Sequence, residues 1–374
     1  MGETRRSTRA AALLALTFIC AGTALGRSDP PAVPFEAYDF HQYIQISGPS
    51  PLDVINLDTN AQLVTACVEP STKEDLRALG ILLCESQIEV LRAWRLIEES
   101  EEGLVTAFPM LDAPEAALLR AKSAAAAAEL AEKAGSCVER LTAALEPHGR
   151  RESTYTIVFS YVLDGLVWER FRDSGVLEER AVTATEPWWS GEVWAVYPPR
   201  AFSMGTNTIS DAGVSLSINW TEDAIPIMLP FVTDWRNFGQ MFDDYVASGR
   251  VTDAEAYETF APYGLFDETG TFVIPVLTEE RGDAIFEACS ALADLVADSI
   301  PGLVDLDELA SRLDLAGEEQ TIVVVYHEIM WDLMDRLEAK GFVSKPVALA
   351  DPGSAAPSDI GSLAFVTRRG PARP

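Results

Sequence analysis

Apolar residues recur every three or four positions over long stretches of the chain, the spacing that places them on one face of a helix. Two segments, Ser71–Glu74 and Asp112–Glu115, also have the capping-box pattern of a helix start. The pattern predicts helices over residues 71–80, 86–97, 112–145, 154–171, 235–247, from 252 onward, 279–299, 306–313 and 318–340. Residues 154–171 are apolar around most of the helix circumference, so we expect this helix to be buried.

The middle of the chain has a different period. Residues 214–220 alternate between apolar and polar side chains, which predicts a strand with one buried face. Residues 193–197 are the expected partner of this strand, and further strands are predicted over residues 104–108, 225–231 and 272–276. The predicted fold class is therefore α+β and helix-dominated, with two helical regions flanking a small, mostly antiparallel sheet.

Two parts of the chain resemble winged-helix proteins. Residues 303–350 contain a short helix through Leu309–Leu313 and then a long helix that ends before Gly341-Phe342-Val343. More faintly, residues 71–110 follow the order helix, turn, helix and strand. The resemblance implies helix-turn-helix elements, but a recognition helix that meets DNA should be basic. The long helix instead carries Glu328, Asp332, Asp335 and Glu338, so we expect the likeness without nucleic-acid binding.

The N-terminus has the features of a secretory signal peptide. Arg5, Arg6 and Arg9 precede an apolar run, and small residues follow up to Gly26, so residues 1–26 are the predicted signal and the protein is expected to be exported, either periplasmic or extracellular. The run is too short to span a bilayer, and no later uncharged stretch is long enough, so we expect no integral membrane span. A lipid anchor on Cys20 is not expected, because Ile19 stands where lipoprotein signals have a small residue.

Proline content and helix signals suggest how the rest of the chain is divided. Pro30, Pro31 and Pro34 cannot lie inside a helix, and Pro, Gly, Ser and Ala dominate the C-terminus. The expected parts after the signal are an extended segment over residues 27–70, an N-terminal helical domain over 71–175, a sheet plus C-terminal helical domain over 176–350, and a mobile tail over 351–374.

Charge and cysteine content narrow the function classes. The chain has 58 Asp and Glu against 28 Lys and Arg, a net charge of −30, which disfavours nucleic acid and anionic membranes as partners. After the signal, four cysteines remain, and the sequence leaves open whether they form disulfides or stay free thiols. These are Cys67, Cys84, Cys137 and Cys289. No Cys-x-x-Cys pair occurs, so a thiolate zinc site is not expected.

Motifs of common catalytic sites are missing from the sequence. There is no Gly-x-Ser-x-Gly elbow, Walker loop or Gly-x-Gly-x-x-Gly fingerprint, and His327-Glu328 lacks the second histidine of a zinc peptidase because Trp331 occupies that position. We therefore expect neither a metal nor a cofactor. A glycosidase needs only two carboxylates, so a hydrolase whose carboxylate site assembles in the fold remains the second candidate function.

The most unusual segment is residues 186–200, which contains three tryptophans within seven positions beside proline and glycine. Aromatic faces near polar groups bind sugars, peptides and apolar ligands. The candidate ligand-binding residues are Trp188, Trp189, Trp194, Tyr197 and Arg200. The alternative is that these rings close the core. The sequence thus favours an exported, acidic, non-catalytic binding or scaffold protein, whose ligand is a protein, a sugar or a small molecule.

Overall fold

The structure, a computed structural model, describes residues 33–368 except Glu186, Ala212 and Asp234. Helices greatly outweigh strands in this part of the chain, so the predicted helix-dominated α+β class is confirmed. The predicted signal peptide and Cys20 lie outside the described residues.

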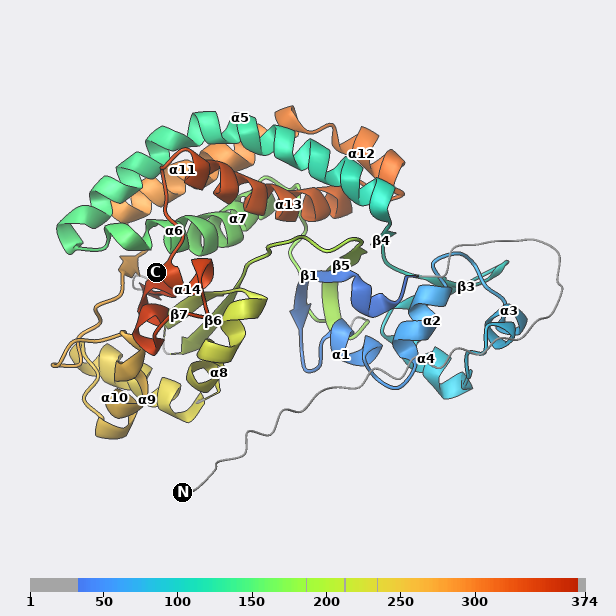
Figure 1. Cartoon of the computed structure of the whole chain (residues 1–374), viewed down its shortest axis with the longest axis horizontal. Coiled ribbons are helices and arrows are strands. Elements are labelled where there is room, and N and C mark those ends of the chain that lie inside the picture. Colours follow the sequence, from blue (N-terminus) through green and yellow to red (C-terminus); the bar gives the residue numbers. More distant parts are fainter. Residues whose placement is uncertain (1–32, 186, 212, 234, 369–374) are drawn as a thin grey trace, which may run out of the picture. The chain divides into compact units, whose positions relative to one another are not determined.

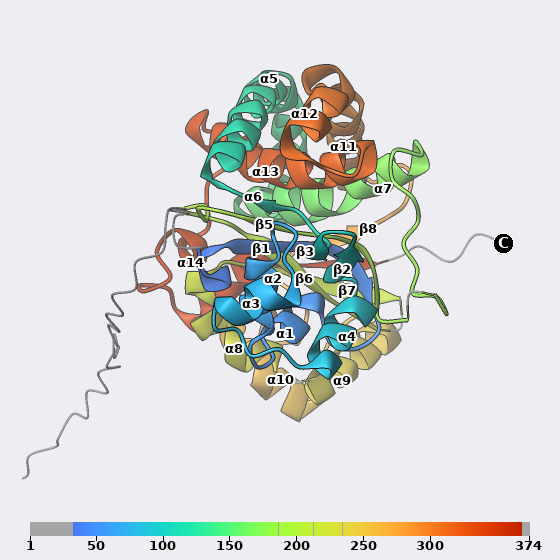
Figure 2. The ribbon, with the colours of Figure 1, turned by 90° about the vertical axis from the view of Figure 1, so that its right-hand side faces the viewer.

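Three long helices form one layer around α5 (Ala113–Leu145). Asp112 caps α5 as predicted, accepting a hydrogen bond from the Glu115 backbone N–H at 3.0 Å. The helices α11 (Ala284–Leu303) and α13 (Glu318–Ala339) pack against α5 through their apolar faces. Figures 1 and 2 show these three helices on one side of the strands. These three helices supply more than a third of the buried residues of the larger hydrophobic core.

The segment expected to be a buried helix is helical and buried, but its centre is a π-helix. It consists of α6 (Thr154–Thr156), the π-helix η4 (Ile157–Leu166) and α7 (Val167–Asp173). Apolar side chains on all sides of η4 pack against neighbouring elements, including α11 and α13. A π-helix widens the helical turn and is frequent at functional sites.

The strands form three sheets rather than the single sheet expected. The first has the order β1–β5–β4, the second is the hairpin β2–β3, and the third has the order β6–β7–β9–β8. Their bounds are β1 (Asp39–Ile46), β2 (Ile97–Ser100), β3 (Gly103–Thr106), β4 (Met110–Leu111), β5 (Trp189–Val196), β6 (Gly205–Asp211), β7 (Val214–Trp220), β8 (Val276–Thr278) and β9 (Ala364–Arg368).

Three strand predictions are wrong. Residues 272–276 do not form a strand, because Phe272 makes only an isolated bridge to Phe266 and β8 begins at Val276. The expected partner of β7, residues 193–197, instead belongs to β5, which pairs with β1 and β4. Residues 225–231 are not a strand, because they lie in helix α8 (Ile225–Val232). A short apolar run has no period that separates a strand from a helix, and Pro226 fits the first turn of α8, where its missing N–H has no helical partner to lose.

The expected extended segment over residues 27–70 is also wrong for its described part. Residues 33–70 contain β1 and the helices α1 (Pro51–Ile55) and α2 (Asn60–Ala66). Two more helices, α3 (Lys73–Ala78) and α4 (Glu85–Ala93), follow before the hairpin. Ser71 bridges to Leu104 of β3, so the order helix, bridge, helix, helix, hairpin is complete over residues 60–106. The winged-helix resemblance itself stays a prediction.

The C-terminal region differs from expectation as well. Helix α12 (Leu306–Leu313) and then α13 are present, but α14 (Val347–Ala350) follows them, with no strand between α13 and α14. The expected mobile tail contains the 3-10 helix η7 (Pro357–Leu363) and β9, which lies between β7 and β8. The remaining elements are α9 (Trp235–Ser248), α10 (Ala254–Phe260) and the 3-10 helices η1 (Phe35–Ala37), η2 (Glu146–His148), η3 (Arg151–Ser153), η5 (Glu222–Ala224) and η6 (Ala261–Tyr263).

The hydrophobic core does not separate at residue 176. Residues from α5 and η4 share the larger core with α11, α13 and the sheet of β7. A smaller core contains apolar residues from 35 to 110 and three residues of β5. The boundary between the two cores therefore follows the β1–β5–β4 sheet.

Candidate functional site

Strand β5 positions the predicted aromatic residues on opposite faces of its sheet. Trp194 is 1% exposed and belongs to the larger core, whereas Trp189 is 5% exposed and belongs to the smaller one. The two rings therefore do not share one surface, and the alternative that they close the core holds for both. Alternation along a strand sends them to opposite faces, and packed side chains cover each face.

Trp189 fastens β5 to the end of α4. Its indole Nε1 donates a hydrogen bond to the Trp94 carbonyl at 2.8 Å. The Arg95 guanidinium lies 4.1 Å from the Trp189 ring centroid, and Arg95 Nη2 donates to the Trp189 carbonyl at 2.6 Å. These contacts satisfy the polar atoms of a buried indole, as structural tryptophans require.

Trp194 lies in a cluster of rings beneath α13. Its ring centroid is 4.8 Å from that of His327 and 5.3 Å from that of His41. Burial lowers the pKa of His327 to about 3, so its imidazole is neutral at physiological pH. His327 Nδ1 lies 2.8 Å from the Val323 carbonyl one turn earlier, the hydrogen bond of a structural histidine.

Tyr197 and Arg200 also have structural partners. Tyr197 is half-buried, and its ring centroid is 5.6 Å from that of Tyr38. Arg200 is paired with Glu328 and with Asp332, whose Oδ1 accepts from Arg200 Nη2 at 2.5 Å. Arg200 therefore binds the chain after β5 to α13, and the expectation of a cation available to a ligand is wrong.

The carboxylates of α13 also receive side chains from α5. Arg120 Nε is 3.5 Å from Glu328 Oε2, and Ser123 Oγ donates to Asp332 Oδ2 at 2.5 Å. Glu328 is 1% exposed. Removing one partner of such a buried pair leaves an uncompensated charge, so this cluster constrains the packing of α5, α13 and the segment after β5.

Trp188 is the exposed member of the predicted set, with 43% of its surface accessible. Its ring stacks on Trp94 with a centroid distance of 5.6 Å and an interplanar angle of 8°. Trp94 ends α4 and donates its backbone N–H to Val90, one turn earlier, whose side chain is 41% exposed. We call Val90, Trp94 and Trp188 the Trp188 patch. Trp94 is not among the candidate residues selected from the sequence, because its stacking on Trp188 is a contact between distant segments.

The sheet end beside the Trp188 patch is apolar as well. Ile46, the last residue of β1, pairs in register with Trp189 and is 44% exposed. The next residue, Ser47, holds the chain around Trp188 by donating its backbone N–H to the Trp188 carbonyl at 3.0 Å. The patch is thus supported by both α4 and the β1–β5 pair.

One carboxyl in η4 is unusual. Asp164 is partly exposed, yet burial of its carboxyl raises the pKa to about 6, against hydrogen bonds to Thr206 and Trp168 that lower it. The Thr206 hydroxyl also donates to Ser160 Oγ at 2.8 Å, so its one proton cannot serve Asp164 at the same time. A protonated Asp164 removes this conflict, because it can donate to Thr206.

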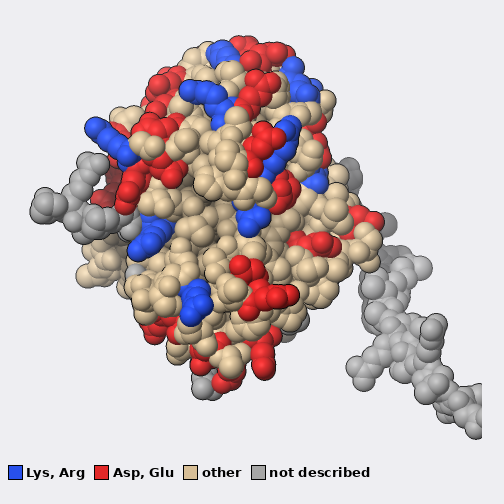
Figure 3. Space-filling model, turned by 90° about the vertical axis from the view of Figure 1, so that its left-hand side faces the viewer, with Lys and Arg blue, Asp and Glu red and all other residues tan. Residues whose placement is uncertain are grey.

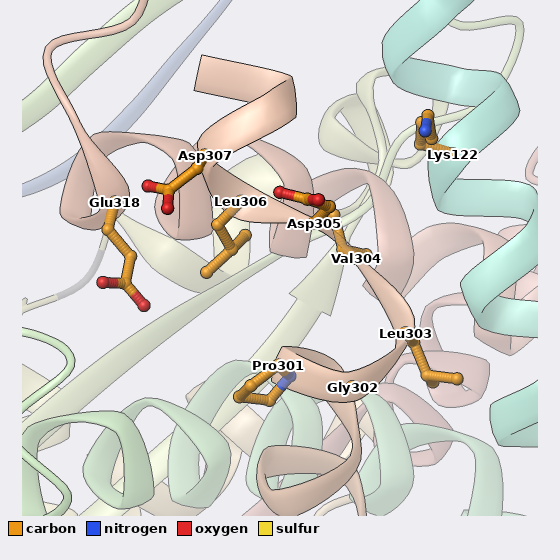
Figure 4. Close-up of a pocket in the computed structure, with 9 residues that line it drawn as sticks. All are labelled: Lys122, Pro301, Gly302, Leu303, Val304, Asp305, Leu306, Asp307 and Glu318. Carbon is orange, nitrogen blue, oxygen red and sulfur yellow. The ribbon is translucent and has the colours of Figure 1, made fainter. Parts of the chain in front are cut away.

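Two surface hollows are acidic. A pocket of about 550 Å³ is lined by Glu69, Glu98, Asp112, Glu115 and Asp314 among apolar residues. A second pocket, of about 540 Å³, lies where α11 turns into α12. Figure 4 shows Asp305, Asp307 and Glu318 around it, with Lys122 on the neighbouring α5. Lys122 is paired with Glu308 at 3.0 Å.

The described residues offer few groups for metal or thiol chemistry. Within residues 33–368, apart from the three omitted positions, no three His, Cys, Asp or Glu side chains are placed to hold a metal ion. The four cysteines in this range are free thiols, and Cys84 is the exposed one. Among the described helices, none combines the length and apolarity needed to cross a membrane.

Comparison with known proteins adds no assignment. The chain matches no family model, no curated protein and no solved structure. The site is therefore interpreted from its own geometry.

Proposed function

We propose that this chain is an exported, acidic binding protein that contacts its partner through the Trp188 patch. The observation that carries the proposal is the pair of stacked indoles at the end of α4, one of them 43% exposed. Tryptophan is enriched at the centres of binding interfaces because a large rigid ring provides contact area at low entropic cost.

The composition of α4 supports a protein partner. Its exposed residues are Glu85, Ser86, Glu89, Val90, Arg92 and Ala93, and its single cation, Arg92, is paired with Glu89 and Glu99. A helix that enters a DNA groove needs cations for the phosphates, so this face is unsuited to nucleic acid. Small and apolar side chains permit the close approach of another protein.

The arrangement of charged groups gives less support to a hydrolase. In the core, Glu328 and Asp332 are both paired with Arg200 rather than facing one reacting point. The pKa of Asp164 is set by burial, Thr206 and Trp168, without a second carboxylate as a cause. Paired carboxylates near a common substrate position are what carboxylate-based hydrolysis requires.

Truncating the exposed ring tests the binding proposal. We expect the free energy of unfolding of the Trp188→Ala variant to lie within about 1 kcal/mol of that of the unaltered protein, because the ring is exposed. We expect it to lose at least about 30-fold in affinity for a partner that the unaltered protein retains from the exported fraction of its native host. Affinity would be measured by surface plasmon resonance with the identified partner.

The matched control is Leu229→Ala on α8, which truncates another exposed apolar residue, 52% accessible, outside the patch. This variant should bind like the unaltered protein. Equal partner affinity for the Trp188→Ala variant would reject the patch as the contact surface.

Export has its own test. We expect protein recovered from the native host to begin near Arg27, as N-terminal mass analysis would determine. An intact Met1 in that protein would reject export through residues 1–26.

A further inference from the structure

The Trp188 patch lies within a strongly acidic part of the chain. Residues 33–112 hold fourteen acidic side chains and four basic ones, compared with 58 and 28 in the whole chain. By contrast, Figure 3 shows a face of the molecule on which Lys and Arg side chains are interspersed with Asp and Glu. The acidic excess is therefore proportionally greater over residues 33–112, which supply Val90 and Trp94, than over the chain as a whole.

All four basic residues of this range already have acceptors. Lys73 pairs with Glu85 at 2.8 Å and Arg77 with Glu74 at 3.2 Å. Arg92 bridges Glu89 and Glu99 at 3.2 and 3.3 Å, and Arg95 is held by the Trp189 carbonyl. These cations neutralise a minority of the local carboxylates, so the region presents a net negative potential to a partner.

Four of these carboxylates lie on the β2–β3 hairpin. Glu98, Glu101 and Glu102 are exposed, and Glu99 reaches α4 through Arg92. Glu98 also lines the acidic pocket of about 550 Å³. In that pocket the pKa of Glu115 is raised by burial and by the nearby charges of Asp112 and Asp314. The hairpin therefore has negative charge on the side of α4 and on the side of the pocket.

We infer that the Trp188 patch docks a basic amphipathic segment of a partner protein, with an apolar anchor against Trp188 and flanking Lys or Arg side chains beside the β2–β3 hairpin. This inference rests on the proposed binding function and adds the chemistry of the partner. The apolar centre would supply affinity by burying the indoles. The charges would supply orientation and association rate, and would disfavour acidic partners.

Three labelled peptides would test the inference on the full chain by fluorescence anisotropy. Each has the same spaced leucine and phenylalanine residues, and the other positions are all lysine, all glutamine or all glutamate. We expect the lysine peptide to bind at least about ten-fold more tightly than the glutamine peptide, and the glutamate peptide to bind most weakly. The preference should fall when salt rises from about 0.05 to about 0.5 M.

Two sets of variants locate the binding. The Trp188→Ala substitution should lower the affinity for the lysine peptide at least about ten-fold. In the triple variant Glu98→Gln, Glu101→Gln, Glu102→Gln, the affinity for the lysine peptide should fall to about the affinity for the glutamine peptide. The affinity for the glutamine peptide should not change. The matched control, Glu129→Gln, Glu258→Gln, Asp298→Asn, alters net charge equally at exposed positions outside residues 33–112 and should bind like the unaltered protein.

The outcomes separate the two proposals. If the glutamine peptide binds as tightly as the lysine peptide and both require Trp188, the binding function stands and the basic partner is rejected. If the lysine peptide binds equally well to the Trp188→Ala variant, its lysines bind carboxylates without contact to the patch, and the inference fails. If no peptide binds while a host partner still requires Trp188, the inference alone fails. If neither the peptides nor a host partner require Trp188 for binding, both proposals are rejected.

Discussion

Trp188 and Trp189 are adjacent in the chain but have opposite environments. The indole of Trp189 is buried, and its Nε1 donates to the Trp94 carbonyl. The Trp188 ring stacks on the Trp94 ring and keeps much of its surface accessible. Both contacts use the same residue of α4, so Trp94 presents its backbone to one tryptophan and its ring to the other. Trp94 therefore supports the exposed Trp188 ring and the buried Trp189 ring at the same time.

Cysteine environments differ as much, which gives a prediction for thiol reactivity. The Cys84 thiol is exposed before α4, and hydrogen bonds from the Ser86 hydroxyl and from backbone N–H groups lower its pKa. Burial raises the pKa of Cys67 to about 11 and also raises that of Cys289. Because the thiolate is the reactive form, we expect one fast-reacting thiol with a disulfide reagent in a chain beginning at Arg27.

The Cys84→Ser variant should lose this fast phase, whereas Cys137→Ser, which alters a buried thiol, should retain it. The number of thiols titrated under native conditions, compared with four after denaturation, is the measurement. Fast reaction of the Cys84→Ser variant would contradict the assignment.

At the scale of elements, local period predicted helices better than strands. Helix α5 was predictable because its cap, its alanines and its apolar stripe all lie within one segment. Strand β1 was missed, since Asp39, His41 and Tyr43 are not apolar, although they face the larger core. Its partner β5 lies about 150 residues away, and such pairing leaves no local pattern. The same applies to β9, a five-residue strand within a segment rich in Pro, Gly, Ser and Ala.

Sequence composition singled out the segment that contains Trp188, but it could not divide the segment into exposed and buried rings. The density of tryptophan in residues 186–200 was visible from the sequence. The exposure of Trp188 depends on Trp94, which belongs to a different element. The pairing of Arg200 depends on α13, more than a hundred residues later. Both are tertiary contacts that single-sequence patterns do not contain.

At the scale of the whole molecule, two ionisable groups make stability depend on pH in opposite directions. His327 has a folded pKa of about 3, below its usual 6.5, so its contribution to stability is present above pH 6.5 and is lost as pH falls toward 3. Asp164 has a folded pKa of about 6, above its usual 3.8. Its proton stabilises the fold at low pH, and this contribution is lost as pH rises from about 4 through 6.

Replacing Asp164 with asparagine isolates the second effect, because asparagine resembles the protonated acid and does not titrate. The titration of His327 is common to both proteins and cancels in the comparison. We expect Asp164→Asn to gain stability relative to the unaltered protein by about 2 kcal/mol more at pH 8 than at pH 4.5, measured by urea unfolding. If the difference in unfolding free energy between the two proteins were the same at both pH values, Asp164 would titrate alike in the folded and unfolded chains. Asp164 would then be an ordinary solvated carboxylate, and the proton that we place between it and Thr206 would be absent at pH 5.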